Sequence, residues 1–247
     1  MTALPLLYVC VRPQQGAAEA EFESFRTALR LESEHVAKHD LVRDPLPRDF
    51  AERFGGFLVG GSPFNVTDPE STKTDVQRRL ESDLERIAAA AADSLTAAVF
   101  TCYGIGVVTR MLGGEVSRAY PEDTGPVMVR LTKDGQSDPI LGGLARSFTA
   151  LTAHKEGTSA LPEGATLLAT NEACPVQAYR VGDRLYATQF HPEPTTRAFT
   201  QRMAVYRDDG YFAANDYDAI AGRVLAASVT EPVRMLRAFA RAFGPAV

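Results

Sequence analysis

Short apolar segments alternate along this chain with stretches of helical periodicity, and this alternation constrains the fold more than any other feature. Residues 4–11, 57–59 and 97–100 are apolar runs of strand length. Residues 17–30 and 74–92 repeat apolar side chains at spacings of three and four. Strands that alternate with helices are typical of an α/β protein. We therefore predict a mostly parallel, mixed central sheet with helices on both faces, in a flavodoxin-like three-layer arrangement.

The second half of the chain continues this pattern and then changes. A helix is expected at 103–112, and further strands are expected at 126–132, 148–153, 166–169, 176–181 and 184–190. From residue 195 onward the sequence predicts three amphipathic helices, at about 196–207, 216–228 and 231–243. We divide the chain into a main domain, residues 1–194, and a C-terminal helical extension, residues 195–247, packed on the same domain.

Composition excludes several classes of function. The chain has 26 Lys and Arg against 31 Asp and Glu, a net charge of −5, which argues against a partner that is nucleic acid or an anionic membrane. Its cysteines, Cys10, Cys102 and Cys174, are widely spaced and odd in number. This argues against a disulfide scaffold or a zinc site and favours a reducing, cytoplasmic compartment. The apolar start at 4–11 is too short for a signal peptide or a membrane span.

The first segment with chemical meaning is the strand that ends at Cys102. A helix is expected to begin directly after it, so the cysteine lies on a sharp strand-to-helix turn. Such a turn projects a nucleophile from the carboxyl edge of the sheet, and the helix N-terminus favours the thiolate. Gly104 leaves room where the strand and the helix crowd together. The alternative is a buried cysteine that serves as a small apolar side chain.

The second segment is the strand that ends in His191-Pro192-Glu193. In extended backbone, residues i and i+2 point to the same side, and Pro192 biases His191 toward extended geometry. Glu193 can therefore orient the His191 ring and leave its other nitrogen facing a nucleophile. The alternative is a surface histidine at a strand end beside a solvated carboxylate.

The third segment is the loop Gly60-Gly61-Ser62-Pro63, which follows a short apolar strand. Glycines after a strand allow backbone N–H groups to approach a ligand closely, although a plain turn is the alternative. A cysteine on a turn, a histidine with an acidic partner and a glycine loop together make a complete acyl-transfer site.

These motifs resemble those of class I, triad-type glutamine amidotransferases, and are similar to the glutaminase domain of GMP synthetase. Cys102-Tyr103-Gly104 matches the nucleophile motif of that family, and Gln189–Glu193 matches its His-Pro-Glu motif. Phe57–Pro63 resembles the oxyanion loop, and Ala153–Glu156 resembles the substrate-side loop. The resemblance covers about residues 4–194. Nothing resembles a phosphate-binding loop, an ATP site or a metal site, and no cofactor is expected.

The resemblance implies a mechanism. Cys102 attacks the side-chain amide of glutamine, His191 passes the proton to the departing ammonia, and Glu193 orients His191. The N–H groups of Gly61 and Tyr103 hold the oxyanion. A γ-glutamyl thioester forms and water releases glutamate, while ammonia passes to a separate synthetase.

The substrate side of the site departs from the family pattern. The candidates for substrate binding are Gly60, Ser62, Gly104, Gly106 and His154. The family commonly has glycine where this chain has Phe100, and glutamine where it has Gly106. Phe100 is expected to shift the turn or narrow the pocket, and Gly106 brings no side chain to the substrate. Lys155-Glu156 stands where the family usually has small or acidic residues.

Three functions remain open at this stage. One is a glutaminase subunit that supplies ammonia to a synthetase in trans. The second is a stand-alone γ-glutamyl hydrolase or peptidase that uses the same thioester chemistry. The third is a non-catalytic interaction module that kept the fold. The expected ligand is glutamine or another γ-glutamyl compound, and the sequence does not predict an oligomeric state.

Overall fold

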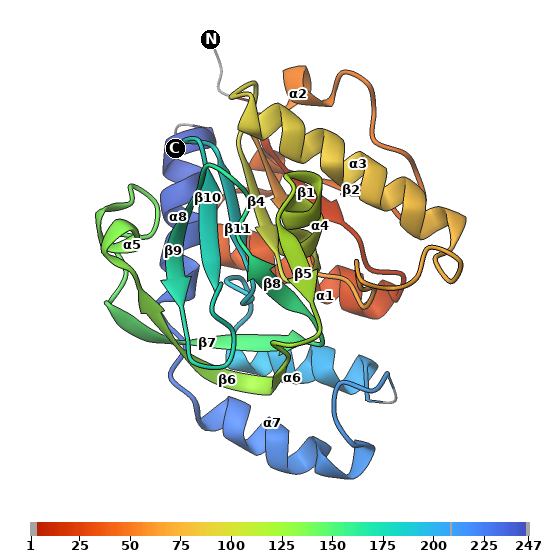
Figure 1. Ribbon diagram of the computed structural model, residues 1–247, viewed down its shortest axis with the longest axis vertical. Helices are drawn as coiled ribbons and strands as arrows, with labels where there is room; N and C mark the ends of the chain where they lie inside the picture. The colour runs from red at the N-terminus through yellow and green to blue at the C-terminus, as the bar shows by residue number, and fades with distance from the viewer. Residues whose placement is uncertain (1–3, 208, 246–247) are drawn as a thin grey trace.

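The structure, a computed structural model, describes residues 4–207 and 209–245. Within them, one sheet has nine strands in the order β2-β1-β3-β4-β11-β10-β9-β6-β7, and β5 pairs with β8 in a second sheet (Figure 1). The strands are β1 (Leu6–Cys10), β2 (Val36–Asp40), β3 (Gly56–Val59), β4 (Ala98–Thr101), β5 (Glu115–Ser117), β6 (Glu122–Leu131), β7 (Ser147–His154), β8 (Gly157–Ala160), β9 (Ala165–Thr170), β10 (Ala178–Val181) and β11 (Leu185–Thr188). The α-helices are α1 (Gln15–Leu29), α2 (Phe50–Arg53), α3 (Asp75–Ala92), α4 (Tyr103–Met111), α5 (Lys133–Ser137), α6 (Thr196–Val205), α7 (Tyr217–Ala226) and α8 (Pro232–Phe243).

Half of the main sheet is parallel, and this half positions the site. Strands β2, β1, β3, β4 and β11 run in the same direction. Every residue of β1, β3, β4 and β11 is buried, which explains why these strands read as continuous apolar runs. Their carboxyl ends lie at one edge, where the chain continues into Arg12, Gly60, Cys102 and Gln189. Ligands of open α/β sheets bind at this edge.

Helices cover both faces of the sheet, as the sequence predicts. On one face, α3 and α4 pack in a cluster that contains Leu84 and Phe100. On the other face, α1 and α8 contribute Phe25 and Phe239 to a cluster that contains Tyr8. The Tyr8 and Phe25 rings have their centroids 5.3 Å apart. The predicted three-layer α/β architecture is therefore confirmed.

The other half of the sheet is antiparallel. It runs from β11 through β10, β9 and β6 to β7. The sequence predicts these strands to within a few residues, but it does not predict β2, β5 or β8. These three lack an apolar run: β2 reads Val-Ala-Lys-His-Asp, and only its first residue is buried. Because β2 lies at the edge of the sheet, its polar residues reach solvent.

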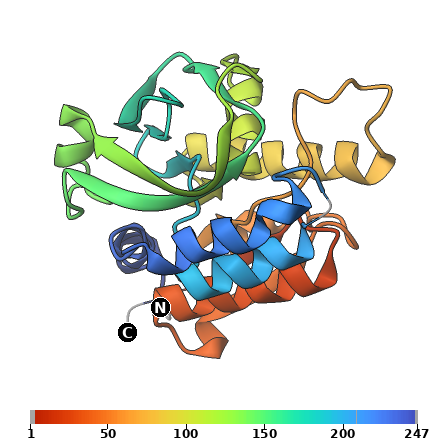
Figure 2. The same ribbon diagram turned by 90° about the horizontal axis from the view of Figure 1, so that it is seen from below.

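The three helices expected after residue 195 are present as α6, α7 and α8. Figure 2 shows α1, α6 and α7 side by side, and α7 also contacts β6. Apolar residues of α6 and α7 meet Leu151 of β7 in a third cluster with Phe199, Met203, Ile220 and Val224. The extension therefore buries its apolar faces, and the division at residue 194 stays a prediction.

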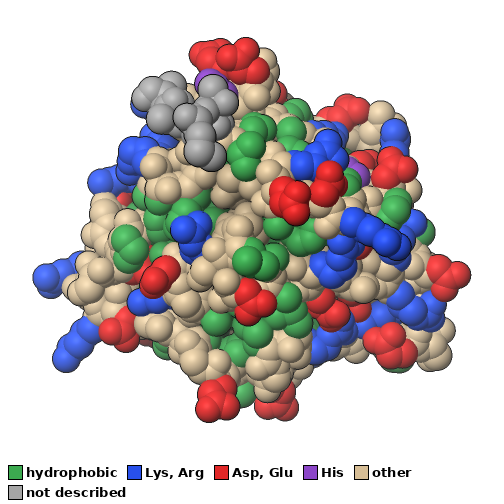
Figure 3. Space-filling view, turned by 90° about the horizontal axis from the view of Figure 1, so that it is seen from above, with side chains coloured by type: hydrophobic (Ala, Val, Ile, Leu, Met, Phe, Trp, Pro, Cys, Tyr) green, Lys and Arg blue, Asp and Glu red, His purple; other side chains and the backbone are tan. Residues whose placement is uncertain are grey.

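Two further observations concern the surface. None of the described helices is long and apolar enough to cross a membrane. On the face shown in Figure 3, acidic and basic side chains are interspersed with apolar ones.

Candidate active site

Cys102 occupies a strained turn between β4 and α4. Its backbone has φ 51° and ψ −104°, a conformation that costs on the order of 1–3 kcal/mol for a residue with a side chain. The turn is tight because α4 crowds β4: a Cβ atom on Gly104 would lie 3.0 Å from Cβ of Phe100. The Cys102 sulfur lies 3.7 Å from the carbonyl oxygen of Ala153 and borders two cavities. Strain that persists at a cleft points to function.

His191 reaches the same place from the end of β11. Its backbone N–H donates to the carbonyl of Leu151 at 2.9 Å, which ties this segment to β7. Ring atom Nδ1 lies 3.2 Å from Oε1 of Glu193, the geometry expected from the His-Pro-Glu spacing. Burial lowers the pKa of His191, but the Glu193 carboxylate and the neighbouring Cys102 sulfur outweigh it and raise the pKa to about 9.

A buried network of charges holds Glu193, and sequence reasoning missed it. Oε1 of Glu193 accepts a hydrogen bond from Nη2 of Arg202 at 2.7 Å. Nη1 of Arg202 donates to Oε1 of Glu21 at 2.7 Å, and Nη2 of Arg12 donates to the same oxygen at 2.7 Å. Burial raises the pKa of Glu193, but His191 and Arg202 outweigh it and lower the pKa to about 2. Glu193 is therefore a carboxylate held by a guanidinium from α6.

The glycine loop lies against this network. The Gly61 N–H donates to Oε1 of Glu21 at 3.2 Å. A Cβ atom on Gly61 would lie 2.8 Å from both Cε1 of His191 and Nη2 of Arg12, so a larger residue here would displace one of these two side chains. Tyr103 stands at the first position of α4, where backbone N–H groups have no partner within the helix. The two expected oxyanion donors therefore differ in this structure. The Gly61 N–H is already bonded to Glu21, whereas the Tyr103 N–H lies at the start of the helix.

The other loop candidates have packing roles in this structure. A Cβ atom on Gly60 would lie too close to Oε2 of Glu21. The Ser62 hydroxyl donates to the carbonyl of Val11 at 2.7 Å, and Ser62 borders both cavities. Gly104 and Phe100 line neither cavity. Phe100 therefore fills the space beside Gly104 in the core.

His154 and Gly106 both line the second cavity, but neither presents a free polar side chain. The two ring nitrogens of His154 hydrogen-bond to the Glu156 carbonyl and the Glu122 carboxylate, each at 2.8 Å. A Cβ atom on Gly106 would lie 3.1 Å from Cγ2 of Val66. The side chain that the family places at position 106 thus has little room here.

Two groups of potential metal ligands occur among the described residues. Glu21, His191 and Glu193 form one, and its members already pair with each other or with arginines. Glu122, His154 and Cys174 form the other. Glu122 there accepts bonds from Asn171 and Gln177 as well as His154. Burial, with the Glu122 charge, raises the pKa of Cys174 to about 12, so its thiol stays protonated. Neither group has the character of a metal centre.

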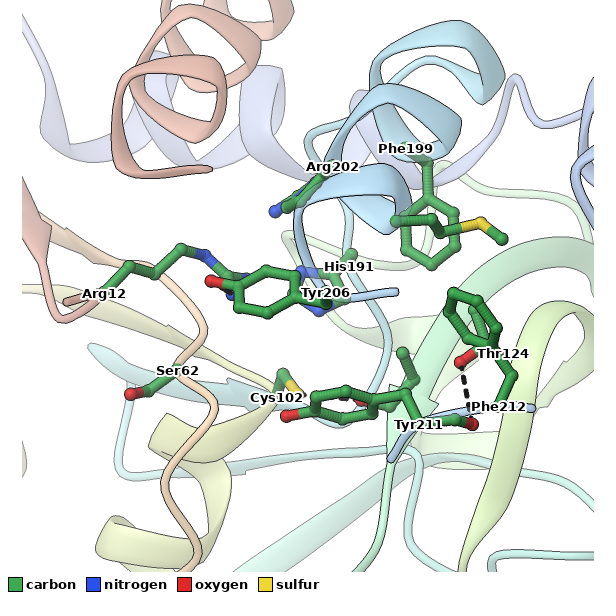
Figure 4. A pocket seen from close by; sticks show the side chains of 12 residues that line it. Arg12, Ser62, Cys102, Thr124, His191, Phe199, Arg202, Tyr206, Tyr211 and Phe212 are labelled. Carbon is green, nitrogen blue, oxygen red and sulfur yellow. Dashed lines mark hydrogen bonds between the residues drawn. The ribbon is translucent and has the colours of Figure 1, made fainter. Parts of the chain in front are cut away.

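Two cavities meet at Cys102. The first has a volume of about 40 Å³, and Figure 4 shows the side chains that line it, among them Cys102, His191 and Tyr211. Phe199 and Met203 of α6 and Phe212 of the following loop complete its apolar walls. The second encloses about 20 Å³ and has a polar lining that includes Asn65, Lys155, Glu156 and Gln189.

An α/β sheet with a cysteine, a histidine and a carboxylate gathered at its carboxyl edge has the arrangement used in nucleophilic acyl transfer. Residues 42–206 match the sequence profile described as glutamine amidotransferase class-I. The match covers more than half of the chain, and the chain belongs to this family.

Similar proteins differ in their activities. Residues of the chain are 28% identical over 149 positions to gamma-glutamyl peptidase 3 of Arabidopsis thaliana, covering 58% of this chain and 55% of that protein. They are 33% identical over 103 positions to the glutamine-hydrolyzing GMP synthase of Aquifex aeolicus, covering 41% of this chain and 20% of that protein. The chain thus matches about half of the first relative and a fifth of the second.

Solved structures show the same fold over nearly the whole chain. A glutamine amidotransferase of Thermotoga maritima superposes with a TM-score of 0.74 at 16% identity, covering 98% of this chain and 99% of that one. A glutamine amidotransferase of Methylobacillus flagellatus gives a TM-score of 0.68 at 17% identity, covering 96% and 93%. The C-terminal helices therefore belong to an architecture that other chains share.

Proposed function

We propose that this chain hydrolyses γ-glutamyl amides, with glutamine as a substrate, through a nucleophilic Cys102. The observation that carries the proposal is the strained backbone of Cys102, which holds the sulfur at a cavity bordered by His191. A buried carboxylate, Glu193, orients that histidine. Family membership supports the reaction class, and the geometry supports the assignment of roles.

The reaction begins with attack of the Cys102 thiolate on the amide carbon. The C–N bond then breaks, and protonated His191 gives its proton to the departing nitrogen, leaving a γ-glutamyl thioester. Water, deprotonated by His191, attacks the thioester and releases glutamate. The raised pKa of His191, about 9, keeps it protonated at neutral pH and ready to act as the acid.

The oxyanion of each tetrahedral intermediate faces the N-terminus of α4. The Tyr103 N–H is free to donate there, and the α4 dipole favours the negative charge. The Gly61 N–H can act as the second oxyanion donor only after the hydrogen bond between Gly61 and Glu21 breaks. Glu21 keeps its hydrogen bonds to two arginines and Tyr8, so this exchange leaves no buried charge unpaired.

The fate of the amine separates two functions. Delivery of ammonia to a synthetase in trans is the first, and the GMP synthase relatives support it. Hydrolysis of γ-glutamyl amides by this chain alone is the second, and the cavity on the His191 side of Cys102 favours it. Cytoplasmic location remains a prediction under both.

The test is glutamate and ammonia release from glutamine by the purified chain, with and without candidate synthetases. Cys102→Ala serves as the inactive control, since a small side chain fits the turn. We expect glutamate release by the wild-type chain and none by Cys102→Ala. Equal, measurable rates from the two proteins would show that Cys102 is not the nucleophile. No thioester and no glutamate with any γ-glutamyl amide would leave a non-catalytic interaction module as the function.

A further inference from the structure

We propose that the cavity on the His191 side of Cys102 is a binding site for the departing amine, and that it selects γ-glutamyl amides of short apolar alkylamines over glutamine. This inference rests on the proposed function and names its substrate class. The selecting walls come from the C-terminal extension, through Phe199, Met203 and Phe212.

The chemistry assigns the two cavities to the two parts of the substrate. The group that protonates the departing nitrogen must lie within hydrogen-bond reach of it. His191 borders the first cavity and not the second, so the amine belongs in the first. Tyr103, whose N–H is the proposed oxyanion donor, borders the second. The acyl portion therefore lies on that side, where Asn65 and Gln189 provide polar groups for an amino-acid head.

The lining of the first cavity sets the character of the amine. Phe199 and Met203 are buried on α6, and the rings of Phe199 and His191 have centroids 6.1 Å apart. Ala153 of β7 and the half-buried Phe212 add further carbon surface. The guanidinium groups of Arg12 and Arg202, which also border this cavity, are already paired with Glu21 and Glu193. An ammonia molecule alone leaves these apolar walls without contact, whereas a short alkyl group covers them.

The size of the cavity sets the length of the amine. A volume of about 40 Å³ corresponds to roughly three water-sized groups, because one water requires about 10–15 Å³ on this measure. With Tyr211 and Phe212 in their present positions, this room suits an amine of two or three carbons better than one that carries an aromatic ring.

Tyr211, like Cys102, borders both cavities. Lys155 holds it: Nζ lies 4.5 Å from the centre of the Tyr211 ring and donates to the carbonyl of Asp209 at 2.9 Å. The second cavity, at about 20 Å³, admits a glutamyl group only when Tyr211 moves. Phe199 and Met203 lie on a helix packed against α1 and α7, so they keep their places when the loop opens.

The experiment compares kcat/KM for glutamate release from glutamine, γ-glutamylmethylamide, γ-glutamylethylamide and γ-glutamylbenzylamide, using the full chain. Each alkyl carbon buried in the transition state is expected to raise kcat/KM about fourfold, at about 0.8 kcal/mol per carbon. The ethylamide should therefore exceed glutamine by about tenfold or more, and the benzylamide, whose amine is aromatic in size but similar in basicity, should fall below the ethylamide.

Two variants test the walls through the ratio of ethylamide to glutamine kcat/KM. Met203→Phe reduces the cavity, so the ratio should fall toward one. Phe212→Ala enlarges it from a surface loop, so the preferred amide should shift from ethyl to a longer alkyl chain. Val205→Phe is the matched control, because Val205 ends the same helix, is 45% exposed and lines neither cavity. It should keep the wild-type ratio.

The outcomes separate this inference from the proposed function. Glutamine hydrolysis at least as fast as that of every alkylamide would overturn the amine site and leave the glutaminase intact. The amine site would also be overturned if Met203→Phe and Phe212→Ala both kept the wild-type ratio of ethylamide to glutamine kcat/KM, or if the benzylamide were the best substrate. No glutamate from any of the four compounds would overturn the proposed function itself, and the amine site with it.

Discussion

Replacing Arg202 with methionine is expected to damage both the stability and the chemistry of this protein. Arg202 is buried and makes two hydrogen bonds of 2.7 Å, one to Glu193 and one to Glu21. Methionine keeps much of the length and apolar stem of the side chain but removes the guanidinium. Because one partner of a buried ion pair is lost, the free energy of unfolding should fall by about 3–5 kcal/mol. Urea unfolding monitored by circular dichroism measures this loss.

The effect on activity follows from the orientation of His191. Without Arg202, Glu193 is free to turn away from Nδ1 of His191, and a displacement of about 1 Å at a catalytic group costs about 10²-fold in rate. The loss should appear in kcat more than in KM. Loss of the Arg202 charge also raises the pKa of Glu193, which this arginine helps to hold at about 2. Glu193 contributes stability that is present above its unfolded pKa and lost as the pH falls, so acid inactivation should begin at a higher pH in the variant.

Two companion variants control this experiment. Arg197→Met removes an exposed arginine from the same helix and should change stability by less than about 0.5 kcal/mol. Arg202→Lys keeps the positive charge but cannot bond to both carboxylates as a guanidinium does. Compared with Arg202→Met, it should therefore recover part of the stability and part of the activity at low pH. If Arg202→Met matches Arg197→Met in stability, kcat and pH profile, Arg202 does not position Glu193 and the reasoning is wrong.

Three further outcomes are expected. Cys102→Gly should abolish glutamate release. It should also raise the free energy of unfolding, measured by urea titration, by about 1 kcal/mol, because glycine adopts a positive φ without strain. A variant less stable than wild type would contradict the strain at Cys102. Iodoacetamide at neutral pH should modify Cys102 before the other cysteines, because burial raises the pKa of Cys10 and Cys174. Peptide mass spectrometry follows the order of labelling, and earlier labelling of Cys174 would contradict Cys102 as the nucleophile. The raised pKa of His191 adds stability that is complete below pH 6.5 and is lost as the pH rises through about 9. Thermal unfolding of wild type should show this alkaline decline more steeply than His191→Gln does, and parallel curves would contradict the pKa shift.

The parts of the site that the sequence predicts are those with local signals. Cys102, His191 and Glu193 each follow an apolar strand, and parallel strands end at a common edge, so their proximity follows from pattern and topology. Arg12 also follows a strand, so its place at the same edge of the sheet could have been predicted from the sequence in the same way. Glu21 and Arg202 lie inside helices, where a charged residue is usually interpreted as part of the solvent-exposed face. Their contact depends on α6 packing across α1, and sequence periodicity does not specify that pairing.

The fold shows the same division between local and distant information. Strands with continuous apolar runs are predictable because burial on both faces demands them. Strand β2 is not, since its polar residues suit either an edge strand or a loop until its partner β1 is known. The Gly61 N–H is a further case: the sequence locates the glycine loop, but only the packing of α1 shows that Glu21 accepts its hydrogen bond.

Gly106, which departs from the family pattern, and Glu156 belong to one local arrangement. Oε1 of Glu156 accepts the Val66 N–H at 2.7 Å, and Oε2 accepts the Thr67 N–H and hydroxyl at 3.1 and 2.7 Å. These bonds hold the loop at residues 65–67 so close to α4 that a Cβ atom at position 106 would lie 3.1 Å from Val66 and 3.6 Å from the Glu156 carboxylate. Glycine at 106 thus makes room for a loop that Glu156 fixes. If the second cavity binds the acyl group as we propose, a glutamine at 106 would reach it only after Val66 shifted, because its Cβ atom would already lie 3.1 Å from Cγ2 of Val66.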